Sequence, residues 1–208
     1  MKLALFSCAL SALALGHATA ANLVTNGSFE APSITSGSYQ IGGITGWYST
    51  IGDGGEIQNY AAGTPFDGAQ LLELDGNQNS NLLQDIQILQ PGVYNLSFEY
   101  SPRPGISADS NPVEIYFQGN LLDTLTGVGA ADTVWSSHNY QVIAAVGFST
   151  LEFRAIGVSD SLGGYIDDVS LAAPVPEASS GLALLALGLM FSKECVANRK
   201  RKQALKNA

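Results

Sequence analysis

One acidic residue stands out in the segment YIDDVSL, because a strand there would turn it toward apolar neighbours. Strict alternation predicts that Tyr165, Asp167, Val169 and Leu171 share one face of this strand. An ionised carboxylate on an apolar face is unfavourable unless it is paired, hydrogen-bonded or bound to a metal. Glu30 offers a second carboxylate, and a hard cation such as calcium would relieve the repulsion between the two acids. We therefore expect either a structural Ca²⁺ site at Glu30 and Asp167 or, in its place, backbone N–H donors or an arginine around Asp167.

Aromatic rings beside polar groups form a second set of candidates, because a flat ring can stack on a sugar while polar groups bind its hydroxyls. The candidates are Trp47, Tyr48, Tyr60, Arg103 and Trp135. Trp47 follows Gly46 at a predicted strand edge and is expected in the core rather than at the surface, whereas Trp135 follows a loop and both placements stay open. Arg103 lies between two prolines and could either clamp a ligand or form a salt bridge with a loop acid.

The usual parts of a nucleophilic enzyme are missing from residues 21–174. This segment has one histidine, His138, and it contains no cysteine, no lysine and no G-x-S-x-G motif. We therefore predict a protein that is not an enzyme. The alternative is a secreted glycoside hydrolase or another polysaccharide-acting enzyme, which would use two of the many carboxylates as a catalytic pair.

The elements that would position these residues are strands. Tyr94, Leu96, Phe98 and Tyr100 alternate with mostly polar neighbours, which is typical of a half-buried strand, and residues 21–174 show no convincing helical period. Similar segments recur along the chain, and a Gly119-Asn120 pair predicts a hairpin. Short strands joined by turns, without alternating helices, predict an all-β fold, an antiparallel β-sandwich of the jelly-roll kind. The expected strands are 44–48, 56–60, 70–74, 82–88, 93–100, 113–118, 121–125, 140–142, 151–153 and 165–171.

Charge is distributed unevenly between the body and the two ends of the chain. Sixteen of the 18 acidic residues and two of the nine basic residues lie in residues 21–174, which gives this segment a net charge of −14. Such a body would be repelled by phosphates, so nucleic acid is excluded as a partner. Neutral or cationic partners, or calcium, suit it better. Both cysteines lie in the terminal segments, so the body has no disulfide.

Both ends of the chain have the patterns of processing signals. At the N-terminus, Lys2 is followed by an apolar segment and by Ala18-Thr19-Ala20, which predicts a signal peptide with its helix in residues 1–20 and a mature protein that begins at Ala21. The body then covers residues 21–174. Residues 175–208 contain an apolar run of 11 residues, 181–191, and then a basic end. A membrane span needs about 20 apolar residues, so this short hydrophobic helix is expected to be a transient membrane handle.

The tail resembles the PEP-CTERM sorting signal of Gram-negative bacteria in the order of its parts, which are VPEASS, a short Leu/Ala/Gly run and a terminal Arg/Lys cluster. Ala178 stands where that signal usually has a second proline. The resemblance implies export by the general secretion machinery and processing by exosortase, a membrane protease-transpeptidase. It also implies a final place on the cell surface or in the extracellular polysaccharide matrix, after a transient stay in the inner membrane.

The body resembles galactose-binding-like β-sandwiches, including carbohydrate-binding modules, through NLVTNGSFE near its start and GYIDDVSL near its end. Between these motifs, ITGWY, LLELDG, LLQDIQIL, PGVYNLSFEY and SPRPG resemble PEP-CTERM body domains and a related plant cell-wall domain of unknown function. The resemblance implies a non-enzymatic, sugar-associated module in which calcium bridges the two ends of the domain. We therefore expect a carbohydrate-binding or structural protein of the exopolysaccharide matrix.

Overall fold

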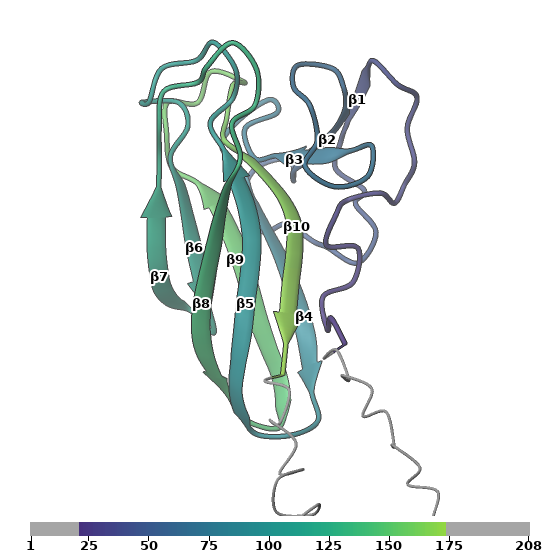
Figure 1. Cartoon of the computed structure of the whole chain (residues 1–208), viewed down its shortest axis with the longest axis vertical. Helices are drawn as coiled ribbons and strands as arrows, with labels where there is room; N and C mark the ends of the chain where they lie inside the picture. Colours follow the sequence, from purple (N-terminus) through teal and green to yellow (C-terminus); the bar gives the residue numbers. More distant parts are fainter. Residues whose placement is uncertain (1–20, 174–208) are drawn as a thin grey trace, which may run out of the picture. The chain divides into compact units, whose positions relative to one another are not determined.

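The computed structural model describes residues 21–173, and within them it confirms an antiparallel β-sandwich of two sheets (Figure 1). The expected signal helix and the C-terminal apolar helix lie outside these residues. Every strand pair is antiparallel. The six-stranded sheet has the order β1 (Ser38–Ile41), β2 (Glu56–Asn59), β3 (Leu71–Glu73), β10 (Tyr165–Ala172), β5 (Gly92–Ser101) and β8 (Ser136–Ala144). The four-stranded sheet has the order β4 (Asn81–Ile88), β9 (Gly147–Ala155), β6 (Val113–Phe117) and β7 (Asn120–Leu125).

The core lies between the two sheets and follows the alternation of their strands. Tyr94, Leu96, Phe98 and Tyr100 of β5 are all buried, as expected for the inward positions of a sandwich strand. Phe98 meets Phe153 of β9 edge to face, with ring centroids 5.1 Å apart. Between residues 21 and 173 the chain contains no helix with the length and apolar character that crossing a membrane requires.

The hairpin between β6 and β7 forms where it was expected, but its turn lies one residue earlier. Gln118 and Gly119 have φ angles of 51° and 73°, and Asn120 already belongs to β7. Positive φ at both central residues is the geometry that matches the twist of a two-residue hairpin. Glycine accepts this conformation at position 119 without a steric penalty.

The two ends of the described chain meet beside β10, although the first motif is not a strand. Asn22 forms an isolated bridge with Ala172, and the Leu23 N–H donates to the Leu171 carbonyl at 2.9 Å. The rest of NLVTNGSFE is irregular, and it is held by Gln84 Oε1, which accepts from Thr25 N–H at 2.7 Å, and by the Gly27 carbonyl, which accepts from Val169 N–H at 3.0 Å. Residues 44–48, another expected strand, contribute only one bridge, and β1 was not expected.

A β-bulge in β10 changes which residues around Asp167 share a face of the strand. The register with β5 shifts between Asp167 and Ser170, and Asp168 has a φ of 48°. Because the extra residue reverses the alternation, Asp167 shares the outer face with Tyr165, whereas Leu171 faces the core. The prediction that Asp167 and Leu171 share a face was therefore wrong.

The two ends of the sandwich are built differently (Figure 1). At one end are the short turns that join β4 to β5 and β8 to β9, together with the last residues of β10. At the other end are four longer loops, which are residues 74–80, 102–112, 126–135 and 156–164. Three of these loops, 74–80, 102–112 and 156–164, contribute residues to the polar site described next.

Candidate functional site

A row of buried residues crosses four strands on the outer face of the six-stranded sheet. The register places Glu56 of β2 opposite Glu73 of β3, Glu73 opposite Tyr165 of β10, and Tyr165 opposite Ser101 of β5. Directly opposite residues of an antiparallel pair share a face. All four are buried, so loops cover this part of the face. Two carboxylates therefore lie side by side under the loops.

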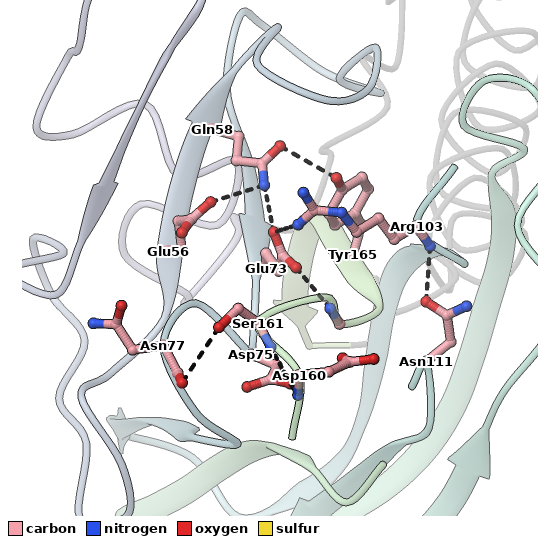
Figure 2. A network of polar contacts seen from close by, with 11 residues as sticks. Glu56, Gln58, Glu73, Asp75, Asn77, Arg103, Asn111, Asp160, Ser161 and Tyr165 are labelled. Carbon is pink, nitrogen blue, oxygen red and sulfur yellow. Dashed lines mark hydrogen bonds and ion pairs between the residues drawn. The ribbon is translucent and has the colours of Figure 1, made fainter. Parts of the chain in front are cut away.

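Gln58 joins the two carboxylates, as Figure 2 shows. It lies on the same face as Glu56, two residues further along β2. Its Nε2 donates to Glu56 Oε1 at 2.8 Å and also to Glu73 Oε2. Its Oε1 accepts from the Tyr165 hydroxyl at 3.2 Å. The amide thus bridges two acids and fixes its own orientation through Tyr165.

Arg103 brings the positive charge that this cluster needs. Its guanidinium pairs with Glu73 and lies 5.9 Å from the centroid of the Tyr165 ring. The backbone is held as well, because Arg103 N–H donates to Asn111 Oδ1 at 2.9 Å, and Asn111 is fully buried. Of the two roles that stayed open for Arg103, the structure shows the salt bridge, and its partner is a strand acid rather than a loop acid.

Loop 156–164 also belongs to the site, because it contacts Glu73. Gly163 N–H donates to Glu73 Oε1 at 2.6 Å. A Cβ at Gly163 would lie only 2.9 Å from the Cβ and backbone N of Asp75, so this close approach requires glycine. Asp75 in turn accepts from the N–H groups of Asp160 at 3.0 Å and Ser161 at 3.2 Å (Figure 2).

Burial dominates the electrostatics of the cluster. Burial raises the pKa of Glu73 to about 8, against the opposing effect of the Arg103 guanidinium. Burial also raises the pKa of Glu56, although hydrogen bonding to Gln58 opposes it. Arg103 forms an ion pair with Glu73 alone, so these two neighbouring acids, bridged by Gln58, favour a state in which the pair keeps a proton.

A polar pocket of about 420 Å³ opens above this network. Its lining includes Tyr39, Glu56, Gln58, Asn77, Arg103 and Ser161. Tyr39 projects from β1 opposite Gln58 and is 64% exposed. The pocket therefore combines carboxylate and amide acceptors, guanidinium and amide donors, and a solvent-facing aromatic ring.

Trp47 and Tyr48, two of the predicted sugar-binding residues, differ in exposure, and the structure corrects the prediction for Trp47. Trp47 is buried, its ring lies 5.5 Å from Phe29, and its Nε1 donates to the Asn26 carbonyl at 3.1 Å. It is a core residue, as its position beside Gly46 suggested, and it has no face for a ligand. Tyr48 is exposed, but it lies against β4, where its hydroxyl donates to Asp85 at 3.2 Å.

Tyr60 and Trp135 lie outside the pocket lining. Tyr60 follows β2 directly and is half exposed, with a φ of 53°. Trp135 is partly buried, and its Nε1 donates to the Thr64 carbonyl at 3.0 Å. Its ring meets Phe66 edge to face at 6.2 Å. Of the five predicted sugar-binding residues, Arg103 alone lines the pocket.

The two predicted calcium ligands, Asp167 and Glu30, accept hydrogen bonds from backbone N–H groups of the loop between β2 and β3. Asp167 Oδ2 accepts from the N–H groups of Phe66 and Asp67 at 2.9 and 3.1 Å, and its Oδ1 accepts from Asp168 N–H at 2.8 Å. Glu30 Oε1 accepts from the N–H groups of residues 69 and 70, both at 2.7 Å. These N–H groups supply the positive partial charge that a calcium ion would otherwise supply to the two carboxylates. Backbone donors, the alternative to calcium, thus satisfy the Asp167 carboxylate in this structure, and the calcium site stays a prediction.

Sequence reasoning missed most of the pocket, although a signal was present. Glu73 interrupts the apolar LLEL segment, and Glu56 and Gln58 alternate along one short strand. Polar residues at such positions are buried only with partners. In a body with two arginines, they were the natural partners for Arg103. Tyr39 lies on β1, which the sequence pattern did not reveal.

Comparison with known proteins identifies the tail. Residues 174–202 match the PEP-CTERM protein-sorting motif. This confirms the resemblance seen in the sequence and marks the chain as an exported protein of the kind that exosortase processes.

The body is similar to carbohydrate-binding modules in its fold. The solved structure of a family 16 carbohydrate-binding module superposes with a TM-score of 0.51 at 14% identity, covering 73% of this chain and all of that module. The chain is also 26% and 27% identical over 188 residues to multifunctional-autoprocessing repeats-in-toxin proteins of Vibrio cholerae and Vibrio vulnificus. It spans only about 4% and 3% of the length of those toxins. The chain thus joins a β-sandwich body, similar in fold to a family 16 carbohydrate-binding module, to a PEP-CTERM sorting motif.

Proposed function

We propose that this protein is a non-enzymatic carbohydrate-binding component of the cell surface or exopolysaccharide matrix, delivered there through its PEP-CTERM tail. The observation that carries the proposal is the polar pocket, in which Glu56, Gln58 and Arg103 stand beside the exposed ring of Tyr39. A sugar hydroxyl both donates and accepts hydrogen bonds, so it needs acceptors and donors within one small space. The pocket offers both.

The network under the pocket supports binding by keeping these groups in place. Gln58 is held by Tyr165 and by two carboxylates, and Arg103 is held at both its backbone and its guanidinium. Within residues 21–173 the Arg103 side chain makes a single hydrogen bond, so further guanidinium N–H groups are free for a ligand. Groups fixed before binding lose less conformational entropy when the ligand arrives.

Charge favours a neutral sugar over an acidic one. The body carries 16 acids against two arginines, and Arg103, the one cation among the described residues that line the pocket, is already paired with Glu73. A uronic-acid polymer would meet repulsion from the whole surface as well as in the pocket. We therefore assign neutral, hydroxyl-rich saccharides as the ligand class.

The hydrolase alternative lacks a second accessible carboxylate in the pocket. Glu56 lines the pocket, but Glu73 is fully buried under Arg103, Gln58 and Gly163. Glycoside hydrolysis needs two carboxyl groups that both reach the scissile bond. Ser136 Oγ and His138 Nε2 lie 3.0 Å apart and line another cavity, of about 290 Å³. Within the described residues, however, no carboxylate hydrogen-bonds to that imidazole, so a nucleophilic triad is incomplete.

The proposal includes the finer fold class and the route of export. We assign the sandwich to the galactose-binding-like jelly rolls, supported by the two terminal motifs that meet beside β10. We also assign the tail a transient place in the inner membrane, where exosortase removes it.

A glycan array with the full-length protein tests the binding proposal. Tyr39→Ala and Arg103→Lys should each lower retention on neutral glycans at least about tenfold, because a stacking ring or a planar donor fork is lost. Tyr48→Ala removes another exposed tyrosine, which lies outside the pocket, and should retain full binding. Equal retention by all three variants, or a preference for uronic-acid glycans, would contradict the proposal.

A further inference from the structure

An exposed apolar surface lies at the short-turn end of the sandwich. It consists of Leu89, Val93, Ile143, Val146 and Phe148, which are 70%, 41%, 77%, 65% and 73% exposed. We call these five residues the tip. Single exposed apolar residues are ordinary, but contiguous patches mark interaction sites.

The strands and turns place the tip residues around this end of the sandwich. Val93 lies opposite Ile143 on the outer face of the six-stranded sheet, while Phe148 lies opposite Gln87 on the outer face of the four-stranded sheet. Leu89 and Val146 occupy the turns between the sheets, β4 to β5 and β8 to β9 (Figure 1). Apolar groups therefore surround the end of the sandwich instead of forming a flat face, a shape that suits insertion into a soft medium.

The tip is also free of charge in an otherwise acidic body. Residues 86–98 and 133–151 contain no aspartate, glutamate, lysine or arginine, although residues 21–174 hold 16 acids. An acidic surface is repelled by anionic lipid headgroups, and burying a charge at their boundary with the acyl chains is costly. The missing acids at this end remove both penalties.

The chain leaves the body at this same end. Ala172 of β10 pairs with Asn95, three residues from the start of β5, and the sorting motif covers residues 174–202. A body that is tethered through this point meets a bilayer with the tip first.

We propose that the tip is a membrane-contact surface, which rests in the headgroup region of the bilayer that holds the tail before processing. This inference rests on the proposed membrane stage of sorting, and it is independent of the sugar pocket. Apolar side chains of interfacial segments enter a membrane by about 5–10 Å. Contact at this depth would orient the body on the membrane and present its C-terminal junction at a fixed height for cleavage.

Hydrogen exchange of the full-length protein tests the proposal, with and without vesicles of phosphatidylethanolamine and phosphatidylglycerol. Amides of residues 87–93 and 143–148 should exchange at least about fivefold more slowly on vesicles. Amides of loop 126–135, at the other end, should not change. The double variant Ile143→Asp/Phe148→Asp should lose the protection and still associate through its tail. A matched double variant, Val128→Asp/Val158→Asp, places the same charge in the loops at the other end and should keep it.

Three results would overturn the inference. Vesicle-bound protein with unprotected turns would remove the tip proposal alone. Failure of the full-length chain to associate with vesicles would remove both the membrane stage and the tip proposal, but would leave sugar binding untouched. Protection of the turns without vesicles that grows with protein concentration would assign the surface to a second copy of the chain.

Discussion

At the scale of single residues, the site depends on two buried acids and one ion pair between Arg103 and Glu73. Glu73 is fully buried, and its donors come from three places, Arg103, Gln58 and Gly163. Removing one partner of such a group leaves the others with an unbalanced charge or an unpaired donor. The protonation of Glu73 should therefore influence the stability of the whole protein.

We predict that stability falls as the pH rises from about 4 to about 8. Burial raises the pKa of Glu73 to about 8 and that of Asp167 to about 7. In the unfolded chain these groups titrate near 4. Between these values the folded state holds more protons, so the free energy of unfolding decreases with rising pH. Thermal midpoints across this range would measure the slope, which Glu73→Gln should flatten. A midpoint that rises with pH in this window, or an unchanged slope in Glu73→Gln, would contradict the assignment.

The two tryptophans should respond differently to truncation. Trp47→Ala empties a core position against Phe29 and Phe153 and should cost about 3–5 kcal/mol of unfolding free energy. Trp135 is partly exposed and holds Thr64 through one hydrogen bond, so Trp135→Ala should cost less than half as much. Urea unfolding of both variants gives the comparison. Equal losses would show that Trp135 also belongs to the core.

At the scale of elements, carboxylates organise the loop between β2 and β3. Asp167 holds residues 66 and 67 of this loop, and Glu30 holds residues 69 and 70. Both acids come from segments distant in sequence. Their carboxylates therefore tie the first and last parts of the body to one loop beside the candidate site.

The loop contacts predict how Asp167→Asn and a calcium chelator affect the thermal midpoint. Asp167→Asn keeps one acceptor but turns an NH₂ group toward backbone N–H groups, so it should cost about 1–3 kcal/mol. For a chain of this size the thermal midpoint would fall by about 2–12 °C. A chelator should leave the midpoints of the unmutated protein and of the variant unchanged. The exposed Asp109→Asn is the matched control, and a fall of the unmutated midpoint on chelation would instead restore the calcium site.

Particular residues show how far the sequence could lead. The alternation of β5 and the apolar pattern of β9 predicted their strands and inward faces, because a half-buried strand leaves a period of two. Asp168 shows the limit, since a one-residue bulge reverses the face on which every later residue of the strand lies, and no glycine in the sequence marks its position. The pocket could not be predicted for a related reason, because Glu56, Glu73 and Arg103 meet only through the pairing of β2, β3, β10 and β5. Strand order is a long-range property that no local pattern encodes.

At the scale of the whole molecule, the body separates its two proposed contacts. Residues at the long-loop end line the pocket, and the tip and the end of β10 lie at the short-turn end. Figure 1 shows these two ends of the sandwich on opposite sides of the body. A body attached at one end keeps its other end free for the surrounding matrix. This arrangement suits a protein that is sorted at a membrane and then works outside it.

Processing of the native protein should remove both terminal segments. We expect protein recovered from the outside of the native host to begin at Ala21 and to lack residues 199–202, because the first is the predicted signal cleavage site and the second belongs to the matched sorting motif. Intact-mass spectrometry distinguishes the forms. An extracellular form with the complete basic end would contradict processing, and a full-length form that stays in the membrane would indicate a simple anchor.

The length of β5 sets the distance between the pocket and a membrane at the short-turn end of the sandwich. This strand has ten residues from Gly92 at the turn end to Ser101 in the row with Glu73 and Tyr165, which is a rise of about 30 Å. At physiological ionic strength the potential of a charged lipid surface decays over about 8 Å. A pocket held this far above a bilayer experiences almost none of that potential. Sugar affinity should therefore be the same on neutral and on anionic membranes, even though the body itself is strongly acidic.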